Sequence, residues 1–343
     1  MTVSTLDLYN ITNLEPFQVY NDDFMSILGS TPQLTNILNS SNSSFPQFHE
    51  AGIFFSEDPN PVLFITSNQY NKSDSPATNN QQIAISRIEF DGQRWSSSIV
   101  TPTEAQIVLA NGGTKYKDAI VILDQGSLTT PGGLVYMNAT PPYASKVLIN
   151  NYLGAEFNSP NDVFATRDGA LWFTDPDYGS WQGIRPAPTL PTQVYRYVPD
   201  TNDIRVVADG FVEPNGITFS PDENTVYITD GAGNSSVPQN SRAIYAFDVL
   251  SRNGEPYLTN KRIFATSQVG IPDGIKVDVS GNVYAGCGDG INVWNSGGKL
   301  LGKIVVDGGS ANFVLGTKGQ VWLLNEDKLW LASLNAMLGI VNR

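Results

Sequence analysis

The stretch NDVFATRDGALWFTD, from Asn161 to Asp175, decides the fold. It opens with a polar residue, continues with a short alternating apolar run, turns at Asp168-Gly169 and closes with a second apolar run. Alternation with a period of two is typical of half-buried strands, and Asp-Gly between two such runs is typical of a β-hairpin turn. We therefore expect a hairpin over 161–175.

The same arrangement recurs along the chain, which indicates a repeat architecture. A polar residue opens each copy, and we call it the head residue. Clear copies also begin at Asn215, Asp273 and Asn312, a looser copy begins at Glu50, and a weaker copy spans Asp118 to Asn138. Six repeats in 343 residues give roughly 57 residues each, which suits a four-stranded propeller blade with long connections.

We predict an all-β fold, a six-bladed β-propeller with four-stranded blades and a central channel. Strand-like runs at 193–199 and 243–250 would supply outer strands, and no window shows sustained helical periodicity. A two-sheet sandwich is the alternative, but it does not require the same polar residue before each first strand. We expect residues 1–45 to be an N-terminal extension. Residues 46–343 would form a single propeller domain, because radial closure packs every blade against its neighbours.

The amino-acid composition limits which partners and which kinds of metal site the chain can have. Lys plus Arg is 20 and Asp plus Glu is 33, so the formal net charge is −13. This acidic balance disfavours nucleic acid and anionic membranes as partners, and no stretch approaches the roughly 20 apolar residues of a membrane span. One cysteine and one histidine exclude an intrachain disulfide and any metal site that needs two imidazoles from one chain. Oxygen ligands remain, and these suit hard cations such as calcium.

The N-terminal sequence MTVSTLDLYNITNLEP shows neither the basic n-region nor the apolar h-region of a signal peptide. Two alternatives stay open, a cytosolic protein and a secreted protein whose signal was removed before Met1. The low charged content of 15% and the glycosylation sequons favour an extracellular protein, although an Asn-rich chain forms several sequons by chance. The sequons lie at Asn10, Asn39, Asn42, Asn71, Asn138 and Asn234.

The head residues are candidates for a metal site. Equivalent positions in successive blades form a ring, so one mouth of the channel would gather Glu50, Asn161, Asn215 and Asp273. Calcium binds mixtures of carboxylate, amide and water oxygens, and four protein ligands leave positions open for water or substrate. Asn and Asp also suit turns for purely structural reasons. The shared phase nevertheless favours a site, and a proline precedes three of the heads, at Pro160, Pro214 and Pro272.

At these residues the chain resembles the senescence-marker-protein, gluconolactonase and luciferin-regenerating-enzyme family. The matching strings are SPNDVFATRDGALWFTDPDYG (159–179), EPNGITFSPDENTVYITD (213–230) and IPDGIKVDVSGNVYAGCGDGINVWNSGGKLLGKI (271–304). Within the family it most resembles the fungal lactonohydrolase branch, through FHEAGIFF (48–55), ITSNQ (65–69) and QGIRPAPTLPTQVYRY (182–197). The resemblance runs from about residue 45 to the C-terminus.

The resemblance implies a six-bladed propeller that holds a divalent cation, and many members of the family hydrolyse lactones. Carried over by motif, the family's N-terminal glutamate matches Glu50, and the asparagine of its Asn-Asp motif matches Asn161. The asparagine of Pro-Asn-Gly matches Asn215, and the aspartate of Pro-Asp-Gly matches Asp273. One departure is Gly52, where the family commonly has proline, and this affects the turn near Glu50 rather than the ligand.

We therefore expect a calcium-dependent lactonase that hydrolyses a small sugar-type or related lactone to its hydroxy acid, with another divalent cation as the alternative metal. Asp273 is the first candidate for the general base and Glu50 the second. Weaker candidates for substrate contact are His49, Tyr178, Trp181, Gln182 and Arg185. A non-hydrolytic propeller that binds a small ligand or a protein remains the alternative, because propellers host many functions.

Overall fold

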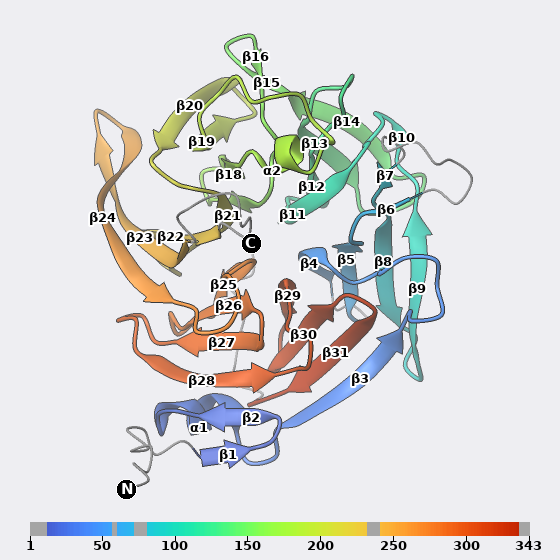
Figure 1. Ribbon diagram of the computed structural model, residues 1–343, viewed down its shortest axis with the longest axis vertical. Coiled ribbons are helices and arrows are strands. Elements are labelled where there is room, and N and C mark those ends of the chain that lie inside the picture. The colour runs from blue at the N-terminus through green and yellow to red at the C-terminus, as the bar shows by residue number, and fades with distance from the viewer. Residues whose placement is uncertain (1–11, 57–59, 72–80, 232–240, 336–343) are drawn as a thin grey trace, which may run out of the picture.

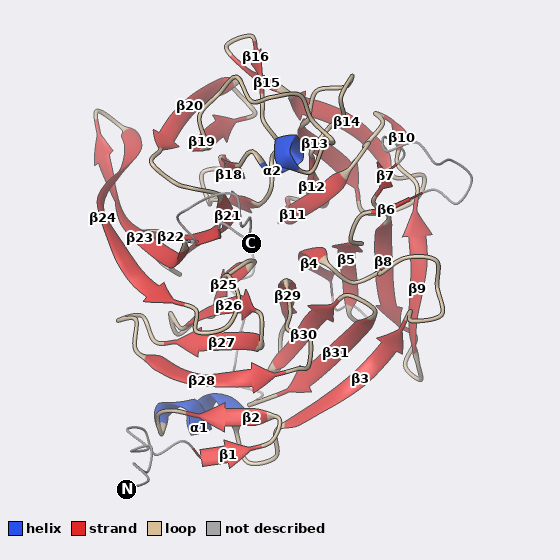
Figure 2. Cartoon of the chain, viewed as in Figure 1, coloured by secondary structure: helices blue, strands red, loops and turns tan. Residues whose placement is uncertain are grey.

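The computed structural model describes residues 12–56, 60–71, 81–231 and 241–335. Within these ranges nearly all regular structure is strand, and the only helices are the short α1 (Asp23–Leu28) and α2 (Tyr178–Trp181) (Figure 2). None of the described helices is long and apolar enough to cross a membrane. The architecture is therefore that of an all-β protein, as the hairpin repeats predict.

Six antiparallel sheets are arranged as blades around a common centre, which confirms the predicted six-bladed propeller (Figure 1). The first blade contains β4 (Glu50–Ser56), β5 (Val62–Thr66), β8 (Ile85–Phe90) and β9 (Trp95–Val100). The second contains β11 (Ala110–Tyr116), β12 (Ala119–Asp124), β13 (Gly133–Asn138) and β14 (Ala144–Ile149), with β10 (Thr103–Glu104) beside β14. The third contains β17 (Val163–Ala165), β18 (Leu171–Asp175), β19 (Gln193–Val198) and β20 (Asp203–Ala208).

The remaining three blades follow in chain order. The fourth contains β21 (Pro214–Phe219), β22 (Thr225–Gly231), β23 (Arg242–Arg252) and β24 (Glu255–Thr266). The fifth contains β25 (Ile275–Val277), β26 (Val283–Cys287), β27 (Gly290–Trp294) and β28 (Leu300–Val305). The sixth contains β29 (Asn312–Leu315), β30 (Gln320–Asn325), β31 (Lys328–Ser333) and β3 (Gln33–Asn39). Outside the blades, β6 (Tyr70–Asn71) pairs with β7 (Gln81–Gln82), and β15 (Asn151–Tyr152) pairs with β16 (Ala155–Glu156).

The N-terminal segment completes the sixth blade and extends the fifth. β3 pairs antiparallel with β31, so strands from the two ends of the chain lie side by side and close the ring (Figure 1). β2 (Phe17–Val19) pairs with β28, and β1 (Thr12–Leu14) pairs with β2, which extends the fifth blade. The boundary expected at residue 45 therefore does not separate residues 12–39 from the sheets. The sequence gives little sign of this, because β3 is an outer strand whose side chains are mostly exposed.

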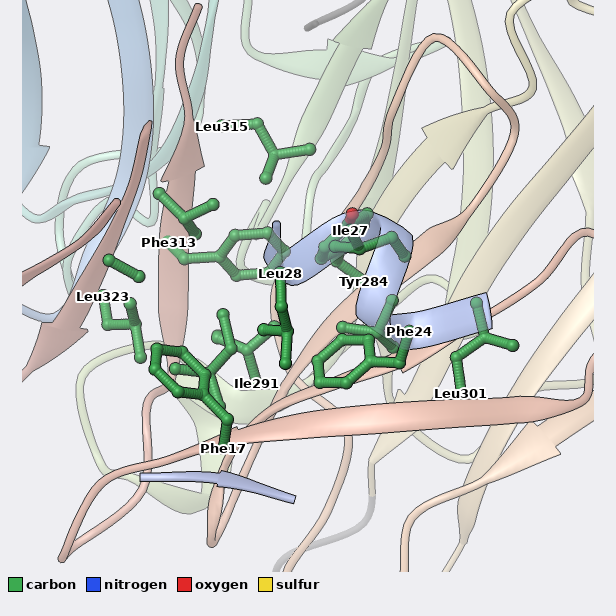
Figure 3. Close-up of a cluster of buried hydrophobic side chains, with 14 of the residues drawn as sticks. Phe17, Phe24, Ile27, Leu28, Tyr284, Ile291, Leu301, Phe313, Leu315 and Leu323 are labelled. Atoms are coloured by element: carbon green, nitrogen blue, oxygen red, sulfur yellow. The ribbon is translucent and has the colours of Figure 1, made fainter. Parts of the chain in front are cut away.

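Part of the N-terminal segment also belongs to the core of the fifth blade. Phe17 of β2 and Phe24 of α1 are buried against Ile291 and Leu301 of that blade (Figure 3). A Cβ atom at Gly302 would collide with the Phe24 ring, so this glycine allows the helix to lie directly on the sheet. Truncating a buried phenylalanine to alanine costs about 3–5 kcal/mol. The segment is thus a structural part of the propeller.

The second blade differs from the sequence-based expectation. The hairpin predicted at 118–138 forms β12 and β13, the second and third strands, whereas the inner strand is β11. β11 reads ANGGTKY and lacks apolar alternation, because Gly112 lies against the next blade, where a Cβ would collide with the carbonyl oxygen of Asn161. The head residue of this blade is therefore Asn111. The other five predicted hairpins do form the two inner strands of their blades.

Candidate metal and substrate site

A cavity of about 370 Å³ lies at the head end of the inner strands. Its lining includes all four predicted ligands, together with the head residue of the second blade: Glu50, Asn111, Asn161, Asn215 and Asp273. The head residue of the sixth blade, Asn312, does not line the cavity but donates from Nδ2 to Glu50 Oε2 at 2.7 Å. The structure thus brings the four predicted ligands together in one cavity, and Asn111 lines the same cavity beside them.

Threonines at the ends of second strands hold the head residues of the next blade. Thr174 Oγ1 donates to the carbonyl oxygen of Asn215 at 2.6 Å, and Thr229 Oγ1 donates to that of Asp273 at 2.8 Å. In the same way Thr66 Oγ1, in the first blade, donates to a carbonyl oxygen of the second, that of Asn111, at 3.0 Å. All three threonines are fully buried, so these bonds fix where successive head residues lie relative to one another.

An aspartate at the end of the second strand holds the segment that leads into the inner strand of the same blade. Asp175 accepts hydrogen bonds from the backbone N–H groups of Asn158 and Ser159 at 3.0 and 2.9 Å. Asp230 and Asp124 do the same for the fourth and second blades. Burial raises the pKa of Asp175 to about 7, although these backbone hydrogen bonds lower it in part. Side chains outside the cavity therefore position the heads.

Two oxygens in the ring are buried without a protein partner. Among the described residues, neither Asn161 Oδ1 nor Asp273 Oδ1 accepts a hydrogen bond. Asn215 Nδ2 donates to the hydroxyl of Tyr178 at 3.3 Å, and that hydroxyl donates to the carbonyl of Gly231 at 2.8 Å. This leaves the Asn215 amide oxygen free to face the cavity. A buried acceptor without a donor is costly, so an electropositive partner would satisfy these atoms.

The two carboxyl groups of the ring disfavour each other's ionised form. Burial raises the pKa of Glu50, and the charge of Asp273 raises it further. Burial also raises the pKa of Asp273, although hydrogen bonds with Glu50 and Asn215 lower it in part. Two adjacent buried carboxyls cannot both ionise without a cation or a shared proton. A divalent cation between them would let both carry their charge.

The residues present fit a hard cation. The set contains two carboxylates and two amide oxygens, which is the mixture that calcium accepts and which lacks the soft ligands of copper or structural zinc. In the described part of the chain, no three His, Cys, Asp or Glu side chains form a metal cluster by themselves. A cation here would therefore depend on the amides of Asn161 and Asn215 as well as on Glu50 and Asp273.

His49 lines the cavity beside Glu50, at its rim. Its Nδ1 lies 2.7 Å from Oε1 of Glu326, which belongs to the turn between β30 and β31. Burial by itself would lower the pKa of the His49 imidazole, but the hydrogen bond and the charge of Glu326 outweigh it and raise that pKa. His49 and Glu50 are adjacent in sequence, and both line the cavity. The sequence does not reveal the contact between His49 and Glu326.

The long connection 176–192 supplies another part of the rim. Tyr178, Trp181 and Gln182, on or beside α2, all line the cavity. Trp181 Nε1 donates to Oε1 of Glu213 at 3.1 Å, which anchors the exposed indole at the fourth blade. Gln182 Oε1 accepts a hydrogen bond from Gln69 Nε2 at 2.7 Å, so the third and first blades are linked across the rim.

Arg185 does not reach the cavity, contrary to the expectation of substrate contact. Its guanidinium is buried and donates to the carbonyl oxygens of Asn158, Phe157 and Thr130, as well as to the carboxylate of Glu156. The N–H groups of the guanidinium are thus directed at residues 127–130 and 156–158, which lie outside the connection. Arg185 therefore stabilises the insertion that carries Tyr178 and Trp181.

Several side chains of the lining are missing from the sequence-based expectation. Asn111 has a usable signal, because Asn-Gly opens its strand as it does at Asn215-Gly216. The other side chains come from loops or from the two-residue strand β7, where sequence periodicity does not predict a position. They are four neutral amides and two isoleucines: Asn68, Gln69, Gln81, Gln125, Ile83 and Ile271.

The chain is similar in sequence and in fold to known proteins. The family described as SMP-30/Gluconolactonase/LRE-like region matches residues 75–323. Lactonohydrolase oryL of Aspergillus oryzae is 34% identical over 220 residues, which cover 57% of this chain and 50% of that protein. The gluconolactonase of Zymomonas mobilis is 34% identical over 189 residues, covering 52% and 51%.

A solved structure, a gluconolactonase from Xanthomonas campestris, superposes with a TM-score of 0.72 and 25% identity over 94% of this chain and 96% of that one. The chain spans about half the length of the curated relatives it matches. The family match alone covers well over half of the sequence and includes the head residues Asn161, Asn215 and Asp273. The chain belongs to the SMP-30/gluconolactonase/LRE-like family.

Proposed function

We propose that this protein is a calcium-dependent lactonase that hydrolyses a small, neutral, hydroxylated lactone to its hydroxy acid. The observation that carries the proposal is the convergence of Glu50, Asn161, Asn215 and Asp273 on one cavity, with buried oxygens that lack protein partners. The names of the relatives, lactonohydrolase and gluconolactonase, support the same reaction class.

The lining supports the substrate class. Amide side chains dominate it, and they can both donate and accept hydrogen bonds, as the hydroxyl groups of a sugar-type lactone require. No lysine or arginine is among the described residues of the lining, so neither kind of side chain is there to pair with an anionic group of a substrate. A cavity of about 370 Å³ lies at the small end of the range for ligand pockets.

Four side chains of the head end would bind the cation. Glu50, Asn161, Asn215 and Asp273 would hold the calcium ion through their oxygens. When bound, calcium supplies a Lewis acid that stabilises negative charge developing on the lactone carbonyl oxygen. Thr174 and Thr229 hold the backbone carbonyl groups of Asn215 and Asp273, so these two residues need little rearrangement to bind it.

Asp273 is the first candidate for the general base. A water molecule adds to the carbonyl carbon, the carbonyl π pair moves onto oxygen, and the Asp273 carboxylate accepts the proton that the water loses. Collapse of the tetrahedral intermediate breaks the ring C–O bond, and the proton returns to the leaving alkoxide. Without a bound cation, burial and the charge of Asp162 both raise the pKa of Asp273. Glu50 is the second candidate.

The test is a panel of aldonolactones assayed with untreated protein, with EDTA-treated protein and after addition of calcium, magnesium, manganese or zinc. We expect hydrolysis that EDTA abolishes and that calcium restores best. Full activity after metal removal would contradict the metal dependence. Binding of lactones without turnover would instead support a non-hydrolytic propeller.

A further inference from the structure

The single histidine of the chain, His49, forms a hydrogen bond through one ring nitrogen and none with a described residue through the other. Its Nδ1 contacts Glu326 Oε1 at 2.7 Å. Its Nε2 makes no hydrogen bond with any described residue, while the ring lines the cavity. Because a carboxylate can only accept, the Nδ1 atom carries the proton of this bond. The ring atom that remains available to a ligand is therefore Nε2.

Glu326 occupies a backbone position that glutamate rarely adopts. It lies in the two-residue turn between Asn325 and Lys328, which pair in register, and its φ angle is +54°. Tight hairpin turns with positive φ favour Asn or Gly, so a glutamate there carries strain that its contacts must offset. Its carbonyl oxygen accepts a hydrogen bond from the Phe48 N–H at 2.8 Å, which docks the turn directly beside His49.

The second carboxylate oxygen of Glu326 holds another part of the rim. Asn68 Nδ2 donates to Oε2 of Glu326 at 3.0 Å, and Asn68 Oδ1 accepts from the Gln69 N–H at 2.7 Å. Gln69 in turn donates to Gln182. One carboxylate thus orients two residues of the lining, His49 and Asn68, and begins a hydrogen-bonded chain around the rim.

We propose that Glu326 is a positioning residue that fixes His49 with Nε2 directed into the cavity, where it hydrogen-bonds a hydroxyl group of the lactone substrate. This inference rests on the proposed lactonase function. A hydroxyl both donates and accepts, so it pairs with Nε2 in either protonation state of the ring. His49 and Glu326 would then select lactones that carry a hydroxyl at that position over unsubstituted lactones.

The first arm of the test measures the pairing without any assay of activity. Because the chain has one histidine, ¹H–¹⁵N spectra of the imidazole contain a single set of signals. We expect a slowly exchanging, strongly downfield proton on Nδ1 in the wild type. It should be lost in Glu326→Ala and kept in Asp327→Ala, a change in the same turn at a carboxylate without a hydrogen bond or ion pair to the described residues. A wild-type spectrum with the proton on Nε2 alone would overturn the assignment.

The second arm compares kcat/KM for glucono-1,5-lactone and for δ-valerolactone, which has the same ring without hydroxyl groups. His49→Phe should reduce the preference for the hydroxylated lactone by about tenfold, the value of one lost hydrogen bond. His49→Gln, which keeps a polar group at similar reach, should restore most of it, and Glu326→Ala should lie between. Equal losses for both lactones would overturn the assignment of His49 to a substrate hydroxyl. Failure of the wild type to hydrolyse either lactone would reject the proposed function itself, and the spectra would still test the pairing.

Discussion

At the head end of the inner strands the side chains are carboxylates and amides, whereas further along the same strands the lining is largely aliphatic. The second region forms a smaller cavity of about 130 Å³, which includes Ile53, Val163 and Ile217 together with Lys115 and Lys276. Both regions rest on the same six strands and the same radial closure. The fold alone therefore does not select the site, and the difference lies in the residues that open each strand.

The charges in the two regions are also arranged differently. At the head end two acidic groups, Glu50 and Asp273, lie close together, and the described lining contains no lysine or arginine. In the second region Lys276 faces Asp162. Burial lowers the pKa of Lys276, and the charges of Asp162 and Glu50 oppose this. Only the head end thus combines negative charge with unpartnered oxygens, which is what a cation needs.

The largest effect should come from Asp273→Asn. The substitution keeps an oxygen of similar size but removes the negative charge and the basicity. If Asp273 is both ligand and base, lactone hydrolysis should fall by about 10²–10⁴, the usual range for loss of a general base. Calcium affinity, measured by calorimetry, should fall more modestly, and excess calcium should not restore the rate. Recovery of full activity at saturating calcium would show that Asp273 is a ligand only and would pass the base role to Glu50.

A smaller effect should appear in the pH dependence of stability. The pKa of Asp175 in the folded protein is about 7, raised from an ordinary value of 3.8. At a pH between these two pKa values, the folded state therefore holds a proton on Asp175 that the unfolded state releases. Stability should therefore fall as pH rises through that window, by about 2–3 kcal/mol between pH 5 and 8. In Asp175→Asn this part of the slope should vanish. Denaturant unfolding in EDTA at both pH values measures it, and identical slopes in the two proteins would refute the assignment.

Thr229→Val changes a residue that positions Asp273 and leaves the proposed calcium ligands themselves unchanged. The valine keeps the shape but leaves the carbonyl oxygen of Asp273 without its donor. We expect calcium affinity to weaken by about fivefold to tenfold and Thr229→Ser to retain it. Thr66→Val is the matched control, because it removes the same kind of bond to Asn111, which is not in the proposed ligand set. Equal losses of calcium affinity in both valine variants would mean that the effect is general destabilisation.

The smallest effect on function should come from the second region. Lys276→Met keeps the length of the side chain and removes its charge, and no described residue forms a hydrogen bond or ion pair with the Lys276 ammonium. Lactone hydrolysis and calcium affinity should change by less than about threefold, the scale of a screened long-range charge. A loss of activity comparable to that of Asp273→Asn would place the chemistry in the wrong region of the channel.

Much of the head end could be predicted from the sequence, because the same local pattern of residues repeats from blade to blade. Asn215 and Asp273 are recognisable because a proline precedes each, a glycine follows each, and alternating strands come next. The Thr-Asp pairs at 174–175 and 229–230 also recur, and the structure explains them as supports of the heads.

What the sequence does not reveal depends on contacts between distant segments. β11 is unrecognisable by alternation because close packing against the next blade demands glycine at Gly112. Glu326 lies 277 residues from His49 and reaches it only because the ring closes between the sixth and first blades. Arg185 illustrates the reverse case, since a long polar side chain in a loop is as well suited to tying backbone carbonyls as to binding substrate.

Calorimetric titration of calcium into metal-stripped protein decides whether the head residues form a metal site. We expect one calcium ion bound per chain, with affinity reduced in Glu50→Gln and Asp273→Asn and nearly unchanged in Lys276→Met. Absence of calcium binding to the wild type, or equal affinity in all four proteins, would contradict the assignment of the head residues as a metal site.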